Sequence, residues 1–166
     1  PRQKGSHNIG ATNVMRTAGK ALGMMTLLGD MLKGLLPVII AVLLVQEQVW
    51  VAGAGLAALL GHCFPVYLRF KGGKGVATAL GIFLPLAPLA IVFDIAVFAA
   101  GVGISRMVSV GSMAAAAALP ILVWLWGYPA PHIVLGICVG VLIIYRHQEN
   151  IKRLLTGNEN RFWGRS

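Results

Sequence analysis

Long apolar runs alternate with short polar segments along this chain. Five apolar blocks can be marked, at 21–45, 49–66, 76–104, 107–126 and 131–145. A helix that crosses a bilayer needs roughly 20 predominantly apolar residues, so the pattern predicts several membrane-spanning helices. The gaps between blocks are too short for a separate soluble domain. We therefore expect residues 1–166 to form a single integral membrane domain, an all-α polytopic bundle.

Basic residues are distributed unevenly among the gaps. The gaps at 46–48 and 127–131 contain no Lys or Arg, whereas the others carry Arg2, Lys4, Arg16, Lys20, Arg69, Lys71, Lys74, Arg106, Arg146, Lys152, Arg153, Arg161 and Arg165. Because cytoplasmic loops carry an excess of Lys and Arg, we expect the N-terminal stretch, the 67–75 loop, Arg106 and the C-terminal tail to face the cytoplasm. The sequence thus predicts a multi-pass membrane protein.

Block 76–104 must then cross the membrane an even number of times, because both its ends are predicted to be cytoplasmic. It is too short for two full spans, and Pro85 and Pro88 lie near its middle. Proline breaks or kinks a helix when it lies in the interior. We therefore expect two short helices or a re-entrant hairpin over 76–104, and about six helical segments in all.

Composition supports the membrane assignment and changes the interpretation of the charge. The chain is 57% hydrophobic and 11% charged, with a net charge of +9 and a mean hydropathy of +0.79. Soluble domains carry about 25% charged residues, and a nucleic-acid-binding domain would show its basic stripe on a polar surface. Here the basic residues lie between apolar runs, where they can meet lipid headgroups or anionic substrates.

Small residues and one charged pair predict how the helices pack. Gly19 and Gly23, and likewise Gly136 and Gly140, have the spacing that lets helices approach closely. Asp30 and Lys33 lie one turn apart in the first block and are expected to pair, which lowers the cost of placing either in the membrane. Asp94 has no partner nearby in the sequence, and we assign it no role.

Three polar segments hold most of the reactive side chains. The first, residues 5–16, offers hydroxyl and amide groups and then enters a helix, with Thr12 or Asn13 expected as the N-cap. A helix N-terminus with a nearby Arg16 suits an anion. An ordinary capped helix would explain the same residues.

The second segment is rich in glycine and lysine. It contains Gly61-His62 and then Lys71-Gly72-Gly73-Lys74-Gly75. Glycines let the backbone approach an anion, and the lysines supply charge. It is not a Walker A loop, since Lys74 is followed by Gly75 rather than Ser or Thr. A basic turn bound to lipid headgroups remains the alternative.

The third segment follows the last apolar block. Arg146, His147 and Asn150 share one helix face, because residues three and four apart are neighbours. His147 could act as a general acid or base near neutral pH. A basic tail that binds lipid phosphates is the alternative. Together the three segments favour a phosphorylated substrate held at the cytoplasmic face, whereas the five acidic residues form no metal-ligand cluster with histidine.

These segments resemble the three motifs of the PlsY-type acyl-phosphate:glycerol-3-phosphate acyltransferases, in order and over essentially the whole chain. The matching residues are Ser6, Asn8, Gly10, Thr12, Asn13, Arg16, Gly61, His62, Lys71, Gly72, Gly73, Lys74, Gly75, Ala77, Thr78, Arg146, His147, Glu149 and Asn150. The stretch from Asp30 to Pro37 is also similar to that family.

The resemblance implies a function and a site. It implies an enzyme without a cofactor or metal that moves an acyl group from acyl-phosphate to the sn-1 hydroxyl of glycerol 3-phosphate. The product is lysophosphatidic acid for phospholipid synthesis, made at the cytoplasmic face of the bacterial plasma (inner) membrane. His147, Asn150, Lys74 and Arg16 would be catalytic. Substrate phosphate would be bound by Ser6, Asn8, Thr12, Asn13, Lys71, Gly72, Gly73, Gly75 and His62.

Two further expectations concern the start of the chain and the alternatives to an enzyme. The family has a transmembrane helix before its first motif, whereas this sequence begins at Pro1, shortly before Ser6, so we expect an N-terminal truncation. A transporter for an organic phosphate is the alternative function, although transporters place polar groups at the bilayer midplane and often show inverted repeats. A lipid-binding membrane subunit would need only generic basic loops.

Overall fold

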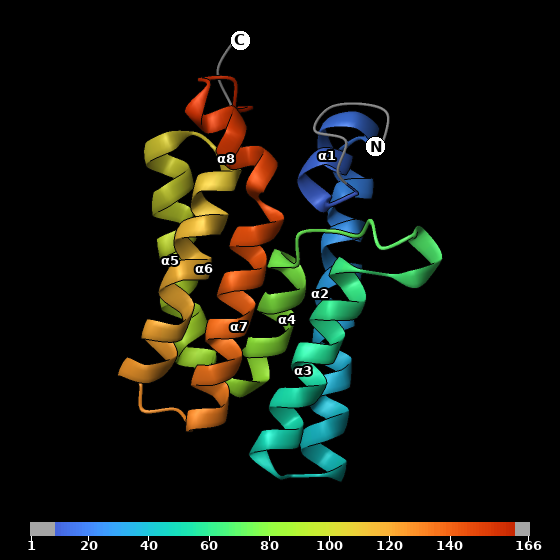
Figure 1. Ribbon diagram of the computed structural model, residues 1–166, viewed down its shortest axis with the longest axis vertical. Helices are drawn as coiled ribbons and strands as arrows, with labels where there is room; N and C mark the ends of the chain where they lie inside the picture. The colour runs from blue at the N-terminus through green and yellow to red at the C-terminus, as the bar shows by residue number, and fades with distance from the viewer. Residues whose placement is uncertain (1–8, 162–166) are drawn as a thin grey trace. The chain divides into compact units, whose positions relative to one another are not determined.

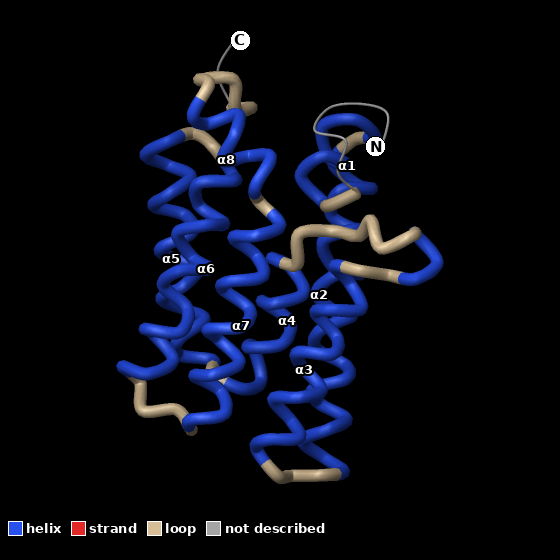
Figure 2. Tube along the Cα trace, viewed as in Figure 1, coloured by secondary structure: helices blue, strands red, loops and turns tan. Residues whose placement is uncertain are grey.

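The computed structural model describes residues 9–161, and over that part it is entirely helical (Figures 1 and 2). The elements are α1 (Ala11–Ala18), α2 (Lys20–Leu44), α3 (Gln48–Cys63), the 3-10 helix η1 (Val66–Leu68), α4 (Val76–Leu86), α5 (Pro88–Ser105), α6 (Val108–Leu125), α7 (Ala130–Arg146) and α8 (Gln148–Leu155). The predicted all-α polytopic bundle is confirmed. Two helices beyond the expected six, α1 and α8, are short and polar on one face, so hydropathy alone does not reveal them.

Four helical segments between residues 9 and 161 are long and apolar enough to cross a membrane. They are Lys20–Leu44, Gln48–Leu68, Pro88–Ser105 and Val108–Leu125. A fifth span results if α7 and α8, which are bent by 54° relative to each other, count as one. Large apolar side chains such as Leu43, Trp50 and Val92 are exposed along these helices. A bilayer is the solvent in which such surfaces are stable.

The helix predicted to break within 76–104 does break, at Ala87. Ala87 has φ −147° and ψ 62°, and Pro88 follows it in the first turn of α5. Proline is favoured there because its missing N–H would have no helical partner. Helix α4 is short, as expected, but α5 has 18 residues and is long enough to span.

The chain divides into two compact units, Pro1–Leu86 and Ala87–Ser166. In the first unit α2 packs against α1, α3 and α4, around fully buried Val38, Leu59 and Phe83. Glycines allow the closest contacts: a methyl group added to Gly34 would meet the carbonyl oxygen of Thr78. This contact holds the start of α4 against the middle of α2.

In the second unit α6 packs against both α5 and α7, and α7 leads into α8. A methyl group on Gly140 would lie 2.5 Å from the Ala116 carbonyl oxygen, and one on Gly136 would lie 3.2 Å from Pro120 Cα. The predicted packing role of Gly136 and Gly140 is therefore confirmed.

Gly23 and Gly19 differ in whether they allow close packing of helices. A methyl group on Gly23 would lie 2.6 Å from Met15 Cβ, so Gly23 does pack between α1 and α2. The packing role predicted for Gly19 is wrong, because nothing lies within 4 Å of its added methyl. Its φ of +98° instead makes it the turn between the two helices, in a conformation that glycine adopts readily.

Within each unit, the basic segments lie at one end. In the first unit, the antiparallel α2 and α3 place α1 and the loop after α3 away from the turn at 45–47 (Figure 1). In the second unit, the turn after α5 and helix α8 lie at the end opposite the turn between α6 and α7 (Figure 1). Both arrangements agree with the charge-based topology, and which end is cytoplasmic stays a prediction.

Candidate active site

The first motif forms α1 and the residue before it. Gly10 is extended, with φ −69° and ψ 159°, and its carbonyl oxygen accepts hydrogen bonds from the N–H groups of Asn13 and Val14 at 3.0 and 3.1 Å. The N-cap predicted at Thr12 or Asn13 is therefore wrong, because both lie inside the helix. Asn13 is buried and Arg16 is exposed on the last turn. Ser6 and Asn8 lie outside the described residues.

The second motif folds back on the end of α3. The N–H of Gly72 donates to the Cys63 carbonyl at 3.1 Å, and the N–H of Gly73 donates to the His62 carbonyl at 3.3 Å. We expected glycine N–H groups to face an anion, but these two are used to close the loop. Lys74, which follows, is half-buried, and Lys71 is exposed.

Gly72, Gly73 and Gly75 all leave no room for a side chain. A side chain on Gly73 would collide with the His62 ring. Gly75 has φ +86°, which L-residues rarely adopt, and an added methyl would lie 2.6 Å from Leu59 Cδ1. The glycines therefore fix the path of the chain on either side of Lys74.

A charged cluster lies beside this loop. Lys33 Nζ lies 2.7 Å from Asp30 Oδ1, which confirms the predicted pair. His62 Nδ1 lies 3.6 Å from the same oxygen, an ion-pair distance rather than a hydrogen bond. A cavity of about 260 Å³ opens here, lined by Ile9, Lys33, Ala58, Gly61, His62, Pro65, Tyr67 and Leu68.

The third motif spans the bend between α7 and α8. His147 is the last residue before α8 and is almost completely buried, with 2% of its surface exposed. Its Nδ1 lies 2.7 Å from the Ile143 carbonyl oxygen. Since a carbonyl only accepts, Nδ1 is the donor, and Nε2 is the basic nitrogen of the neutral ring.

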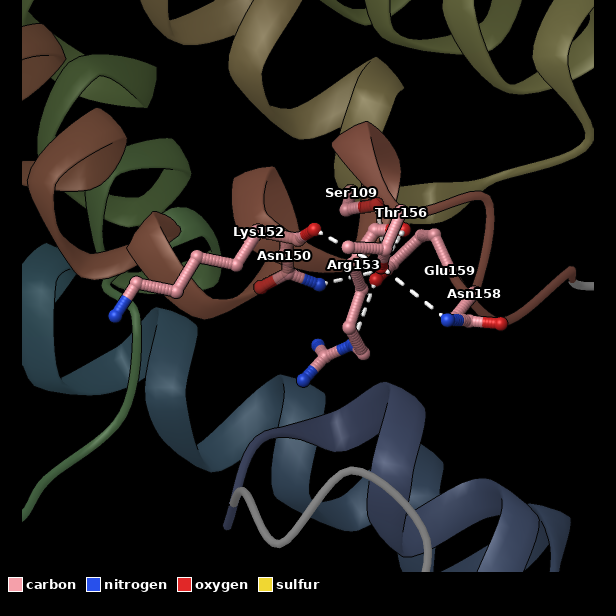
Figure 3. A network of polar contacts seen from close by, with 7 residues as sticks. All are labelled: Ser109, Asn150, Lys152, Arg153, Thr156, Asn158 and Glu159. Carbon is pink, nitrogen blue, oxygen red and sulfur yellow. Dashed lines mark hydrogen bonds and ion pairs between the residues drawn. The ribbon is translucent and has the colours of Figure 1, made fainter.

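Asn150 belongs to a buried polar network centred on Glu159 (Figure 3). Its Nδ2 donates to Glu159 Oε1 at 2.7 Å. Ser109 Oγ donates to the same oxygen at 2.7 Å, and Arg153 Nε donates to Oε2 at 2.8 Å. Glu159 thus joins the start of α6 to α8.

The charge of Glu159 is stabilised by these contacts. Burial alone raises the pKa of this carboxyl, but the hydrogen bonds from Ser109, Asn150 and Arg153 and the Arg153 charge outweigh it. The pKa therefore lies below its ordinary value of 4.5. Glu159 is ionised at neutral pH.

Comparison with known proteins decides the family. Residues 1–157 match the family described as Glycerol-3-phosphate acyltransferase. The chain belongs to this family. Among relatives in the glycerol-3-phosphate acyltransferase family, one from Syntrophotalea carbinolica is 56% identical over 163 residues, covering 97% of this chain and 83% of the relative. One from Geotalea daltonii is 51% identical over 161 residues, with the same coverage.

Two solved structures in the glycerol-3-phosphate acyltransferase family have the same fold. Both are of PlsY (YgiH), described as an integral membrane glycerol 3-phosphate acyltransferase. The glycerol 3-phosphate form is 45% identical, with a TM-score of 0.93, covering 98% of this chain and 82% of PlsY. The lysophosphatidic acid form is 45% identical, with a TM-score of 0.90, covering 95% and 81%. The predicted resemblance to PlsY-type enzymes is confirmed, and the chain is a multi-pass membrane protein.

The predicted site residues of this acyltransferase-family chain fall into two groups. In the first unit, the structure brings His62 together with Gly72 and Gly73, next to Lys74. In the second unit, His147 and Asn150 lie within one turn of each other at the start of α8. The prediction that all three motifs share one pocket stays a prediction.

Glu159 was missed by the sequence analysis. It lies nine positions after Asn150, its hydrogen-bond partner, and beyond the end of α8, so no helical periodicity connects the two. An isolated acid within the basic tail was the only signal available.

Proposed function

We propose that this chain transfers an acyl group from acyl-phosphate to the sn-1 hydroxyl of glycerol 3-phosphate. The observation that carries the proposal is the closed glycine loop before Lys74, in a chain 45% identical to PlsY in its glycerol 3-phosphate form. A related PlsY structure in a lysophosphatidic acid form supports that product. The charge pattern supports a site that faces the cytoplasm at a bacterial inner membrane.

The proposed reaction needs no covalent enzyme intermediate. Acyl-phosphate is a mixed anhydride with a good leaving group. The sn-1 oxygen forms a bond to the acyl carbon, the bond between that carbon and the phosphate oxygen breaks, and inorganic phosphate leaves. The hydroxyl proton passes to a base or to a phosphate oxygen. The protein must then position two phosphate-bearing reactants and stabilise the negative charge that develops.

The basic residues suit that task. We assign the substrate phosphates to Arg16 and Lys71, which are exposed, and to Lys74, which is half-buried. Gly72 and Gly73 would contribute by shaping the loop, because their N–H groups are already bonded to carbonyls. This division of roles differs from a phosphate loop that binds through backbone N–H groups.

His147 can serve as the proton acceptor in this scheme. With Nδ1 donating to Ile143, the remaining nitrogen Nε2 has the lone pair that a base needs. A phosphate oxygen of the substrate is the alternative acceptor of the hydroxyl proton. The amide of Asn150 is held by Glu159 and would fix the geometry at the start of α8.

The proposed activity is tested with purified protein in detergent. Labelled glycerol 3-phosphate and a long-chain acyl-phosphate should give lysophosphatidic acid and inorganic phosphate. Lys74→Ala and Arg16→Ala should each lower kcat/KM by about a hundredfold, because each removes a positive charge that stabilises the negative charge developing on the substrates.

Lys20→Ala is the matched control for Arg16→Ala. Lys20 is an exposed cation at the start of α2, four residues further along the chain, and its loss should change kcat/KM less than about twofold. Equal rates in all four proteins would refute the phosphate-binding roles. Uptake of glycerol 3-phosphate into liposomes without turnover would instead favour a transporter.

A further inference from the structure

Asp30 contacts both ends of the glycine loop. Its backbone carbonyl accepts a hydrogen bond from Thr78 Oγ1 at 3.0 Å, just after the loop enters α4. Its carboxylate lies 3.6 Å from Nδ1 of His62, just before the loop leaves α3. Asp30, in the middle of α2, therefore contacts a residue just before the loop and a residue just after it.

The His62 ring lies between Asp30 and the loop. Its Nδ1 faces the Asp30 carboxylate, whereas its Nε2 edge packs against Gly73, where an added methyl would collide with it. The carbonyl of the same histidine accepts the Gly73 N–H at 3.3 Å. A rotation of this ring would therefore displace Gly73 and, with it, the adjoining Lys74.

Burial indicates which of the two partners of Asp30 matters more. The Lys33 side chain is 55% exposed, and an ion pair so open to solvent contributes little. The side chains of His62 and Asp30 are 6% and 10% exposed, so water screens the interaction of the carboxylate with the dipole or charge of the ring much less. The carboxylate is thus better suited to orient the imidazole than to hold the lysine.

We propose that Asp30 is a positioning residue that sets the glycine loop through His62. Its carboxylate orients the imidazole ring, the ring fixes Gly73, and the loop then holds Lys74 where a substrate phosphate binds. This inference rests on the proposed function for its kinetic consequence, but its structural consequence, a loop loosened by loss of the charge, can be measured without turnover.

The test compares three single variants and one double variant. Asp30→Asn keeps the shape and the backbone carbonyl but removes the charge. His62→Gln removes the ring. Asp94→Asn is the control, since it makes the same Asp-to-Asn change within a membrane-spanning helix but lies in the second unit. The double variant combines Asp30→Asn with His62→Gln, and thermal unfolding in detergent verifies that each protein is folded.

Amide hydrogen exchange of the 66–75 segment is the first readout. Exchange should become faster in Asp30→Asn and in His62→Gln, and should stay unchanged in Asp94→Asn. The KM for glycerol 3-phosphate is the second. It should rise about tenfold in Asp30→Asn with a smaller change in kcat, because a misplaced loop weakens binding first.

The double variant separates positioning from general stability. If Asp30 acts through His62, the KM of the double variant should equal that of His62→Gln alone. If the two residues act independently, their effects on KM should multiply. Multiplying effects, or unchanged exchange in the folded Asp30→Asn protein, would overturn the proposal. A wild-type protein without turnover would refute the proposed function instead, and the exchange measurement would still decide the role of Asp30.

Discussion

At the residue scale, the buried carboxylate of Glu159 shows how one acid can organise a basic segment. Three donors from α6 and α8 surround it, and hydrogen bonds to a charged group are stronger than those between neutral groups. A glutamine at this position would keep the shape of the side chain but lose its charge, so the hydrogen bonds from the three donors would be weaker. Because Asn150 is one of them, the effect reaches a predicted active-site residue.

Glu159→Gln should lower the free energy of unfolding by about 1–3 kcal/mol at neutral pH. The pKa of this carboxyl is lowered in the folded protein, so the stabilisation is complete above the ordinary pKa of 4.5 and is lost as the pH falls below it. Thermal unfolding of wild-type and variant protein at several pH values measures this difference, which should shrink in acid.

Glu149→Gln provides the control for that measurement. Glu149 is exposed in the first turn of α8, so its replacement removes the same charge from the same C-terminal segment without breaking the network. A loss of stability as large as that of Glu159→Gln would show that net charge, not the buried contacts, is responsible.

At the element scale, the glycine loop depends on backbone conformation as much as on charge. Gly75 combines a φ of +86° with close contacts to Leu59 and Cys63. Both features oppose any side chain at this position. The loop therefore reaches α4 along a path that only glycine allows without strain.

Gly75→Ala should lower the free energy of unfolding by about 1–3 kcal/mol and reduce acyltransferase activity. Gly53→Ala is its counterpart in α3, where an added methyl meets nothing within 4 Å. That variant should be as stable as the wild type or more stable, because alanine favours helix. Chemical unfolding in detergent compares the two, and equal stability would contradict the strain assigned to Gly75.

The short helices show which elements hydropathy does not predict. Helices α1 and α8 have eight residues each and carry polar side chains on one face. A search for apolar blocks passes over them, although their motif residues were recognised. The N-cap of α1 was misplaced because the Gly10 carbonyl, rather than a side chain, accepts the first hydrogen bonds.

At the scale of the whole molecule, the unequal distribution of Lys and Arg makes a prediction about topology. Single cysteines at Glu47 and Pro129 should react with a membrane-impermeant reagent in sealed cells, whereas cysteines at Lys71 and Lys152 should react only after permeabilisation. All four positions are exposed. The native Cys63 and Cys138 would first be replaced by alanine.

Labelling of Lys71→Cys in sealed cells would refute the prediction of a cytoplasmic site, because the second motif would then face the outside of the membrane. Lysis of the same cells before labelling provides the control for reactivity. A variant that reacts in neither condition is buried, and its neighbour in the same loop would be used.

The sequence by itself determined the class of the molecule, because bilayer-spanning helices need long apolar runs and the chain has them. It also determined the break before Pro88 and the Asp30–Lys33 pair, since proline chemistry and helical spacing act over a few residues. The ordered motifs determined the family. All of these are local or compositional properties.

Only the tertiary structure decided which groups meet across helices. It placed Asp30 beside His62, turned the Gly72 and Gly73 N–H groups toward carbonyls, and brought Glu159 to Asn150. These contacts join residues from different helices and loops, where sequence spacing carries no information about distance. Packing of helix on helix fixes them, because it brings these buried polar groups to partners that the local sequence does not supply.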